Sequence, residues 1–111
     1  MLRTSDLLKG TTPALILAAL AKEDLYGYRI IKLIQEESDD ALKLGEGSVY
    51  PVLHALESKG LVKGRWETRE IGPARKYYAL TSKGKKELKT AAATWRGYST
   101  AVEGVLGFAG V

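Results

Sequence analysis

The sequence of 111 residues contains no cysteine and only one histidine, His54. The lack of cysteine excludes a disulfide framework and a thiolate metal site, and it fits a reducing compartment. No run of about 18 apolar residues is present, as a membrane-spanning helix would require. The start of the chain also lacks the apolar stretch of a secretory signal. We therefore expect a cytoplasmic protein that does not enter a membrane.

The motifs of the common enzyme classes are missing as well. His54 has no neighbouring cysteine and no companion metal ligand, and no Ser-His-Asp arrangement can be supported from the sequence. No glycine-rich loop follows a strand, and no clustered carboxylates suggest acid–base chemistry. The glycines between 97 and 110 fall on a helical pattern instead. We expect neither an enzyme nor a bound cofactor or metal.

Charge is distributed unevenly along the chain, although the net charge is only +4. Residues 1–60 hold 7 basic against 9 acidic residues, whereas residues 61–111 hold 10 against 4. Within 61–89 the numbers are 9 and 3. This excess indicates a positive field where a polyanion would be met, and a solvated lysine-rich surface explains the charge run alone about equally well.

The stretch from Gly45 to Leu80 has the clearest pattern. We expect a helix over 46–59, with Gly45 as its N-cap and Gly60 as its stop. One side of this helix is apolar at helical spacing: Val49, Val52, Leu53 and Leu56. The other side carries small or neutral polar residues, which suit close approach to a DNA groove. There we expect four residues near bases or phosphates: Ser48, Tyr50, Pro51 and His54.

Two short strands follow this helix. Leu61–Thr68 and Arg75–Leu80 are rich in β-branched and aromatic residues, and Gly72-Pro73 marks a turn between them. A helix followed directly by a two-stranded hairpin is typical of a winged helix-turn-helix. The basic residues that bracket the loop would contact a phosphate or a minor groove: Arg69, Arg75 and Lys76.

Two further helices are expected before the helix over 46–59. Thr12-Pro13 has the form of an N-cap and first helical residue, so the first helix would begin there, and residues 1–10 would form at most a short amphipathic turn. The second would run from about Gly27 to Ser38, with a brief extended piece at 42–44. In a helix-turn-helix, the helix that lies across the recognition helix can touch phosphates, and the candidates are Tyr26, Tyr28, Arg29 and Lys32. Solvent exposure explains Arg29 and Lys32 about as well.

Leu80-Thr81-Ser82 is expected to close the strand and cap a last helix that begins at about Ser82. An a/d-like seam runs along it, and such a stripe on a complete winged domain favours pairing with the same helix of a second copy. The seam consists of Leu88, Ala92, Trp95, Ser99, Val102, Leu106 and Ala109. Gly97, Gly104, Gly107 and Gly110 would each weaken the helix by about 1 kcal/mol, or would allow close approach between protomers. The sequence thus predicts an α+β, mainly α fold, with a DNA-binding domain at 1–81 and a dimerisation helix at 82–111.

The motifs of residues 12–89 resemble the PadR family of transcriptional regulators. The resemblance rests on L-Y-G-Y-R-I-I (25–31), G-S-V-Y-P-V-L-H-A-L-E-S-K-G-L-V (47–62), R-K-Y-Y-A-L-T (75–81) and K-G (83–84). It implies a winged-helix homodimer that binds double-stranded DNA, represses a gene and is released by a small effector, often an aromatic or planar compound. The short chain, with a single helix after the hairpin, resembles the compact subfamily and not the one with a long C-terminal domain.

Within that subfamily, Trp95 matches a tryptophan that stacks flat ligands between two protomers. Packing of the dimer interface explains Trp95 equally well, and no acidic residue except Glu103 is expected near it. Fold alone does not fix function, so a winged-helix adaptor that binds protein instead of DNA remains the alternative.

Overall fold

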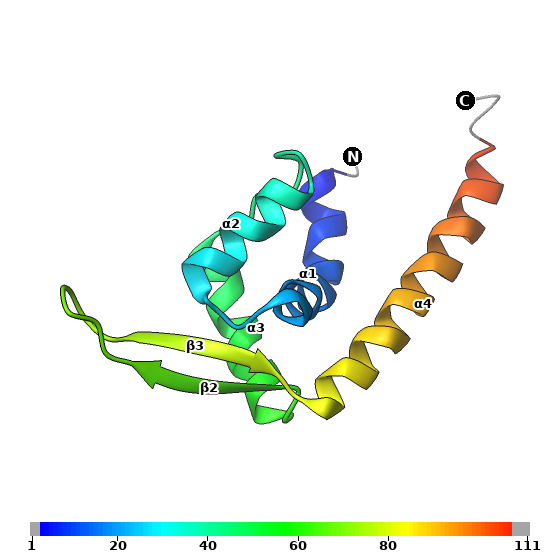
Figure 1. Cartoon of the computed structure of the whole chain (residues 1–111). Coiled ribbons are helices and arrows are strands. Elements are labelled where there is room, and N and C mark those ends of the chain that lie inside the picture. The colour runs from blue at the N-terminus through cyan, green and yellow to red at the C-terminus, as the bar shows by residue number, and fades with distance from the viewer. Residues whose placement is uncertain (1–2, 108–111) are drawn as a thin grey trace.

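The structure is a computed structural model, and it describes residues 3–107. Their elements are α1 (Thr4–Lys22), β1 (Leu25–Tyr26), α2 (Gly27–Glu37), α3 (Glu46–Ser58), β2 (Val62–Glu67), β3 (Arg75–Leu80) and α4 (Ser82–Leu106). Helices α1–α3 gather on one side of a small sheet, and α4 leads away from them (Figure 1). The fold is the mainly helical winged helix-turn-helix that the sequence predicts.

The core lies where α1, α2 and α3 meet one face of the sheet. Each helix contributes the apolar side that its sequence pattern indicates, and Tyr78 closes the core from β3. Burial of these side chains supplies most of the stabilisation, at about 25 cal/mol per Å² of apolar surface. The side chains with the least exposure are Ile16, Leu17, Ile30, Val49, Leu53, Val62 and Tyr78.

Both ends of α3 agree with the sequence prediction. Gly45 is the N-cap, and its carbonyl accepts from the Ser48 and Val49 amides. At the other end Gly60 has a φ of 75°, and the Leu61 amide bonds the Leu56 carbonyl at 2.9 Å. This left-handed closure leads the chain directly into the hairpin of β2 and β3, which forms the wing.

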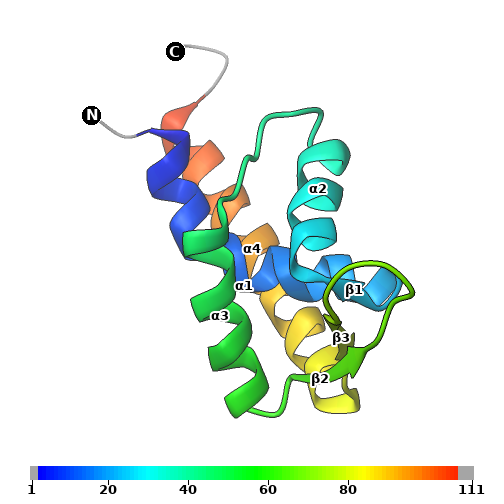
Figure 2. The same cartoon turned by 90° about the vertical axis from the view of Figure 1, so that its left-hand side faces the viewer.

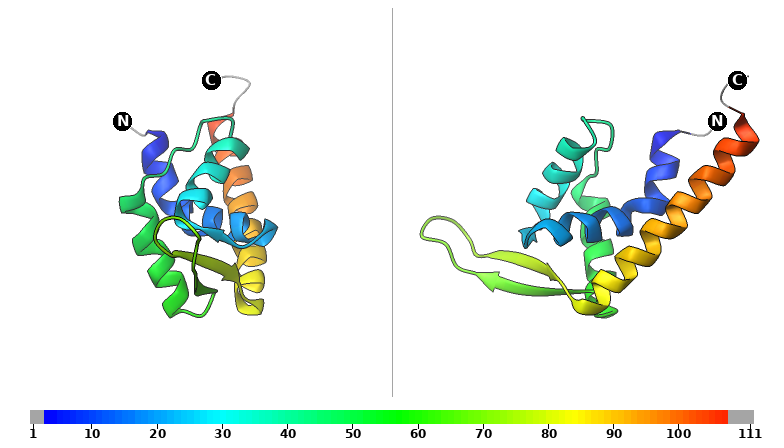
Figure 3. Two further views of the ribbon diagram at one scale, coloured as in Figure 1. Left: turned by 60° about the vertical axis from the view of Figure 1, so that its left-hand side comes forward. Right: turned by 45° about the vertical axis from the view of Figure 1, so that its right-hand side comes forward.

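Helix α1 begins nine residues earlier than the Thr12-Pro13 signal predicts, so that prediction was wrong. The Asp6 carboxylate accepts from the Arg3 amide at 2.9 Å and fixes the true start at Thr4. The Thr12 hydroxyl does not cap; it donates to the Leu8 carbonyl at 2.8 Å inside the helix. Pro13 is likewise internal, and α1 changes direction part-way along its length (Figure 3), as expected where proline removes a backbone hydrogen bond.

The sheet has three strands in the order β1-β3-β2, not the two of the predicted hairpin. Leu25 and Tyr26 of β1 pair antiparallel with Tyr78 and Tyr77 of β3. The extended piece expected at 42–44 is not a strand. Because facing residues share a side of the sheet, Tyr26, Tyr77 and Arg75 lie on the face opposite the core.

Helix α4 starts as predicted, since the Thr81 hydroxyl accepts from the Gly84 amide at 3.0 Å. Gly84 is its only buried residue among those described. The rest of the helix extends from the domain, and the molecule measures 57 × 27 × 21 Å (Figure 3). Gly107, with a φ of 55°, closes the helix after Leu106, and Ala109 of the predicted seam lies outside the described residues.

Candidate nucleic-acid interface

The outward face of α3 is open to solvent. Pro51 and His54 are exposed, as are Gly47 and Ser48 at the start of the helix. Helix α3 stands at the edge of the molecule, beside the wing formed by β2 and β3 (Figure 2). The face has little side-chain bulk, so a DNA groove could approach the helix backbone closely.

Tyr50 lies across the start of α2. A Cβ placed on Gly27 would come within 2.5 Å of the Tyr50 hydroxyl oxygen and 2.7 Å of the ring carbon that bears it. Glycine at position 27 therefore makes room for the ring. Tyr50 is still partly exposed, so its hydroxyl is held at the junction of α2, α3 and the sheet.

Two basic side chains flank a pair of aromatic rings that lie on the outer sheet face and along the first half of α2. The Arg75 guanidinium lies 4.2 Å from the centroid of the Tyr26 ring, and the Tyr26 and Tyr28 rings stack with centroids 6.4 Å apart. The Lys32 ammonium lies 5.6 Å from the Tyr28 centroid. Cation–π contacts keep both charges in place while leaving them hydrated. This set of four, Lys32, Tyr28, Tyr26 and Arg75, is called the cation–aromatic ladder below.

The wing loop is stiffened by Arg69. Its Nε donates to the Pro73 carbonyl at 2.8 Å, and its guanidinium covers Gly72, whose φ is 91°. Arg69 thus supports the loop from inside. The side chain that stands out from the tip is Ile71, which is 86% exposed.

Lys76 is not free at the loop. Its ammonium bonds the Glu57 carboxylate of α3 at 3.0 Å, and the other carboxylate oxygen accepts from the Gly64 amide at 3.1 Å. The hydrogen bond from Lys76 is the largest cause that lowers the pKa of Glu57, and the same bond raises the pKa of Lys76. Charged or titratable neighbours of this pair are His54 and Tyr78, and burial raises the pKa of Tyr78.

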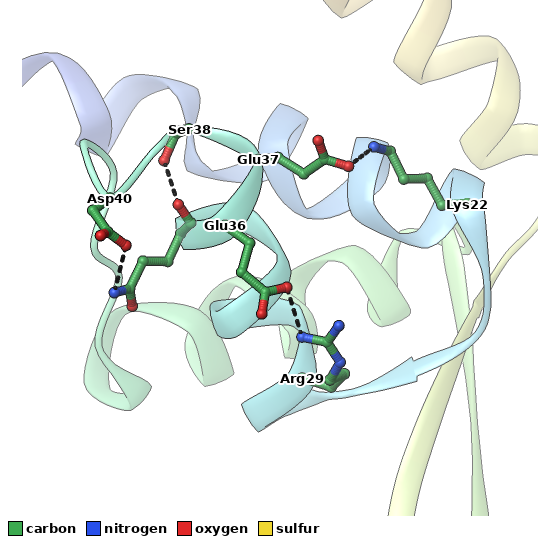
Figure 4. Close-up of polar contacts among 7 residues, drawn as sticks. Lys22, Arg29, Glu36, Glu37, Ser38 and Asp40 are labelled. Carbon is green, nitrogen blue, oxygen red and sulfur yellow. Dashed lines mark hydrogen bonds and ion pairs between the residues drawn. The ribbon is translucent and has the colours of Figure 1, made fainter.

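Other basic side chains are also held in ion pairs. Arg29 donates to Glu36, seven residues or about two turns further along α2, and Lys22 of α1 pairs with Glu37 (Figure 4). Arg65 of β2 bonds Asp24 at 2.6 Å and lies over the Tyr77 ring. The partners of Lys22 and Arg65 lie 15 and 41 residues away along the chain, so no local pattern could indicate them.

A hollow of about 510 Å³ lies between α1 and α4. Trp95 and Tyr98 of α4 line it, with ring centroids 6.3 Å apart. Asp6 and Glu87 line it too, so the expectation that only Glu103 stands near Trp95 was wrong. Glu103 instead accepts a hydrogen bond from Ser99 at 3.2 Å.

The predicted seam residues of α4 differ in exposure. Leu88 packs against the core, whereas Trp95 is 49% exposed and Leu106 is 46% exposed. Ser99 and Val102 are half-buried, and Ala92 is exposed. Among residues 3–107 no helix is long and apolar enough to cross a membrane. The same residues contain no group of three potential metal ligands.

Comparison with known proteins matches this geometry to one family. The family model described as the transcriptional regulator PadR-like family matches residues 16–90. A transcriptional regulator from Clostridium thermocellum has 27% identity and a TM-score of 0.83, over 92% of this chain and 96% of that one. A PadR-like regulator from Bacillus cereus has 32% identity and a TM-score of 0.76, over 91% and 96%.

A PadR family regulator from Clostridium difficile has 35% identity and a TM-score of 0.74, over 86% of this chain and 98% of that one. The matched region spans α2, α3, the wing and the start of α4, which hold the exposed recognition face and the cation–aromatic ladder. With the fold, the interface and these matches in agreement, this chain belongs to the PadR-like family of DNA-binding transcriptional regulators.

Proposed function

We propose that the chain is a homodimeric, sequence-specific repressor that acts in the cytoplasm. Each protomer places α3 in a major groove of double-stranded DNA and rests its wing on the flanking backbone, with half-sites about one helical turn apart. The observation that carries the proposal is the exposed, sterically lean face of α3 next to a wing and an α2 start that both present cations.

The contacts fall into two classes. Ser48, Pro51 and His54 project from α3 and read base edges or approach them. The ladder and Tyr50 meet phosphates, because their cations and hydroxyls lie between α2 and the sheet. Phosphate contacts fix position and carry no sequence information. Arg69 supports this second class from within the wing loop.

Dimerisation is assigned to α4. The helix extends from the domain with Trp95, Tyr98, Val105 and Leu106 exposed, which is more apolar surface than one helix normally leaves in water. Pairing with the same helix of a second copy covers it and supplies the two-fold symmetry that a palindromic operator needs. Sedimentation equilibrium at micromolar concentration should give the mass of two chains. A mass of one chain would overturn this assignment.

The hollow between α1 and α4 is assigned to a planar effector. Its volume lies within the range of small-molecule sites, and it offers two aromatic rings beside two carboxylates. That chemistry favours an aromatic cation, whose binding between α1 and α4 would alter the spacing of the two recognition helices and release DNA. Acridine orange and a neutral aromatic of equal size form a matched pair of probes.

A mobility shift with duplexes selected from a random library tests the main proposal. We expect the wild-type chain to enrich an inverted repeat, and His54→Ala to alter the preferred bases. The exposed Trp66 and Ile71 of the wing, at 69% and 86%, favour a second candidate, a protein-binding adaptor. Failure to enrich any duplex at moderate salt would support the adaptor over the repressor.

A further inference from the structure

One side chain of the recognition helix holds both strands of the wing. The Glu57 carboxylate, near the end of α3, accepts from the Gly64 amide of β2 at 3.1 Å and from the Lys76 ammonium of β3 at 3.0 Å. These bonds join elements that are 7 and 19 residues away along the chain. Helix α3 and the wing are therefore linked by a side chain as well as by the short turn at Gly60.

The surroundings are built for this link. A Cβ at Gly64 would come within 2.9 Å of a Glu57 carboxylate oxygen and 2.3 Å of the Lys76 Cε, so a larger residue there would have to displace one of the two paired side chains. The Lys76 ammonium also lies 5.3 Å from the centroid of the buried Tyr78 ring. With side chains 26% and 34% exposed, this is the most protected ion pair in the described part of the chain.

We infer that Glu57 is a positioning residue that sets the wing at a fixed distance from the recognition helix through Gly64 and Lys76. Lys76 then acts within the protein, not as a phosphate contact. A fixed spacing lets α3 and the wing engage DNA together without first losing conformational freedom, which is the usual source of affinity from preorganisation. The inference rests on the proposed DNA-binding function and adds a determinant that contacts no DNA.

Glu57→Gln provides a test in which the two explanations differ in sign. Removing a negative charge beside the interface, and releasing a lysine, should tighten DNA binding if only the field matters. If Glu57 positions the wing, the same change should weaken binding by about fivefold, as expected for a partly exposed ion pair. The probe is the duplex that the wild-type chain selects from a random library, and the readout is fluorescence anisotropy.

Lys76→Met separates positioning from phosphate contact. If Lys76 is a positioning residue, the variant should bind DNA more weakly, while the slope of log K against log salt should equal that of the wild type. As a phosphate contact it reduces that slope by about 0.9. Lys76→Arg keeps a charged donor for Glu57 and should restore affinity.

Glu37→Gln is the matched control, because it breaks the Lys22–Glu37 pair, which joins α1 to α2 and includes no residue of α3 or the wing, and it should leave DNA binding unchanged. Tighter binding by Glu57→Gln, or a reduced slope for Lys76→Met, would overturn the inference while leaving the proposed function intact. A wild-type chain that selects no duplex would overturn the proposed function itself.

Discussion

Gly27→Ala should weaken DNA binding through Tyr50, a residue on another helix. The new Cβ would stand 2.5 Å from the Tyr50 hydroxyl oxygen and 2.8 Å from a ring carbon. A normal contact needs about 3.5 Å, so the ring must move by about 1 Å. Overpacking of this kind costs about 1–3 kcal/mol, and we expect the low end because the half-exposed ring can swing about its first torsion.

The decisive assay combines Gly27→Ala with Tyr50→Ala in a double-mutant cycle. In the wild-type background Gly27→Ala should lower DNA affinity about tenfold while stability changes by about 1 kcal/mol. In the Tyr50→Ala background the added methyl group meets no ring, so it should have little effect on either quantity. Gly10→Ala, at a helical glycine with open space around it, is the control and should slightly stabilise the chain. Equal losses in both backgrounds would show that the Tyr50 ring does not transmit the effect of the added methyl group.

Four further outcomes are expected. Gly84→Ala places its methyl group against the Leu61 carbonyl, which cannot move aside, so thermal unfolding should show a loss of about 3 kcal/mol or more. Arg75→Ala should weaken binding to all duplexes alike and reduce the salt slope by about 0.9, and a change in base preference would contradict this. The hydrogen bond from Lys76 lowers the pKa of Glu57, so the ionised carboxylate stabilises the fold at pH values above its ordinary pKa of 4.5. This stabilisation is lost as the pH falls through the lowered pKa. The urea midpoints of the wild type and of Glu57→Gln should therefore converge in acid. Emission of Trp95, measured in a Trp66→Phe background, should change with acridine orange, and this response should be lost in Asp6→Asn.

Local signals predicted the elements around α3 well. The glycine stop at Gly60, the cap at Thr81 and the Gly72-Pro73 turn each act through neighbouring residues, and the structure has each where the sequence indicates. The outward face of α3 was predicted for a similar reason, because helical spacing alone separates Val49 and Leu53 from the exposed side.

The missed start of α1 shows how a strong local rule can mislead. Thr12-Pro13 fits a helix start, yet the helix continues upstream to the capping contact between Asp6 and Arg3, and the cost of an internal proline is met by a bend. Because this first turn was not expected to be helical, Asp6 could not be placed beside Trp95. For this reason the hollow was not predicted, although the aromatic and acidic residues that line it are present in the sequence.

Non-local contacts account for the remaining differences. Strand β1 has two residues and forms only because β3 offers an edge, so no periodicity could reveal it. The sequence shows how many basic residues the wing has, but it does not show that Lys76 bonds the Glu57 carboxylate or that Arg69 bonds the Pro73 carbonyl. The tertiary structure determines which partner each charged side chain has. It therefore distinguishes Lys32 and Arg75, the cations of the ladder, from Lys76 and Arg69, which bond other parts of the protein.

The proposed complex has two copies of this chain bound to one DNA duplex through α3 and the wing. The most direct measurement is an anisotropy titration of a selected inverted-repeat duplex, carried out above the dissociation constant and repeated at several salt concentrations. We expect saturation at two chains per duplex and an affinity that falls steeply as salt rises. Saturation at one chain per duplex, or an affinity that does not respond to salt, would contradict it.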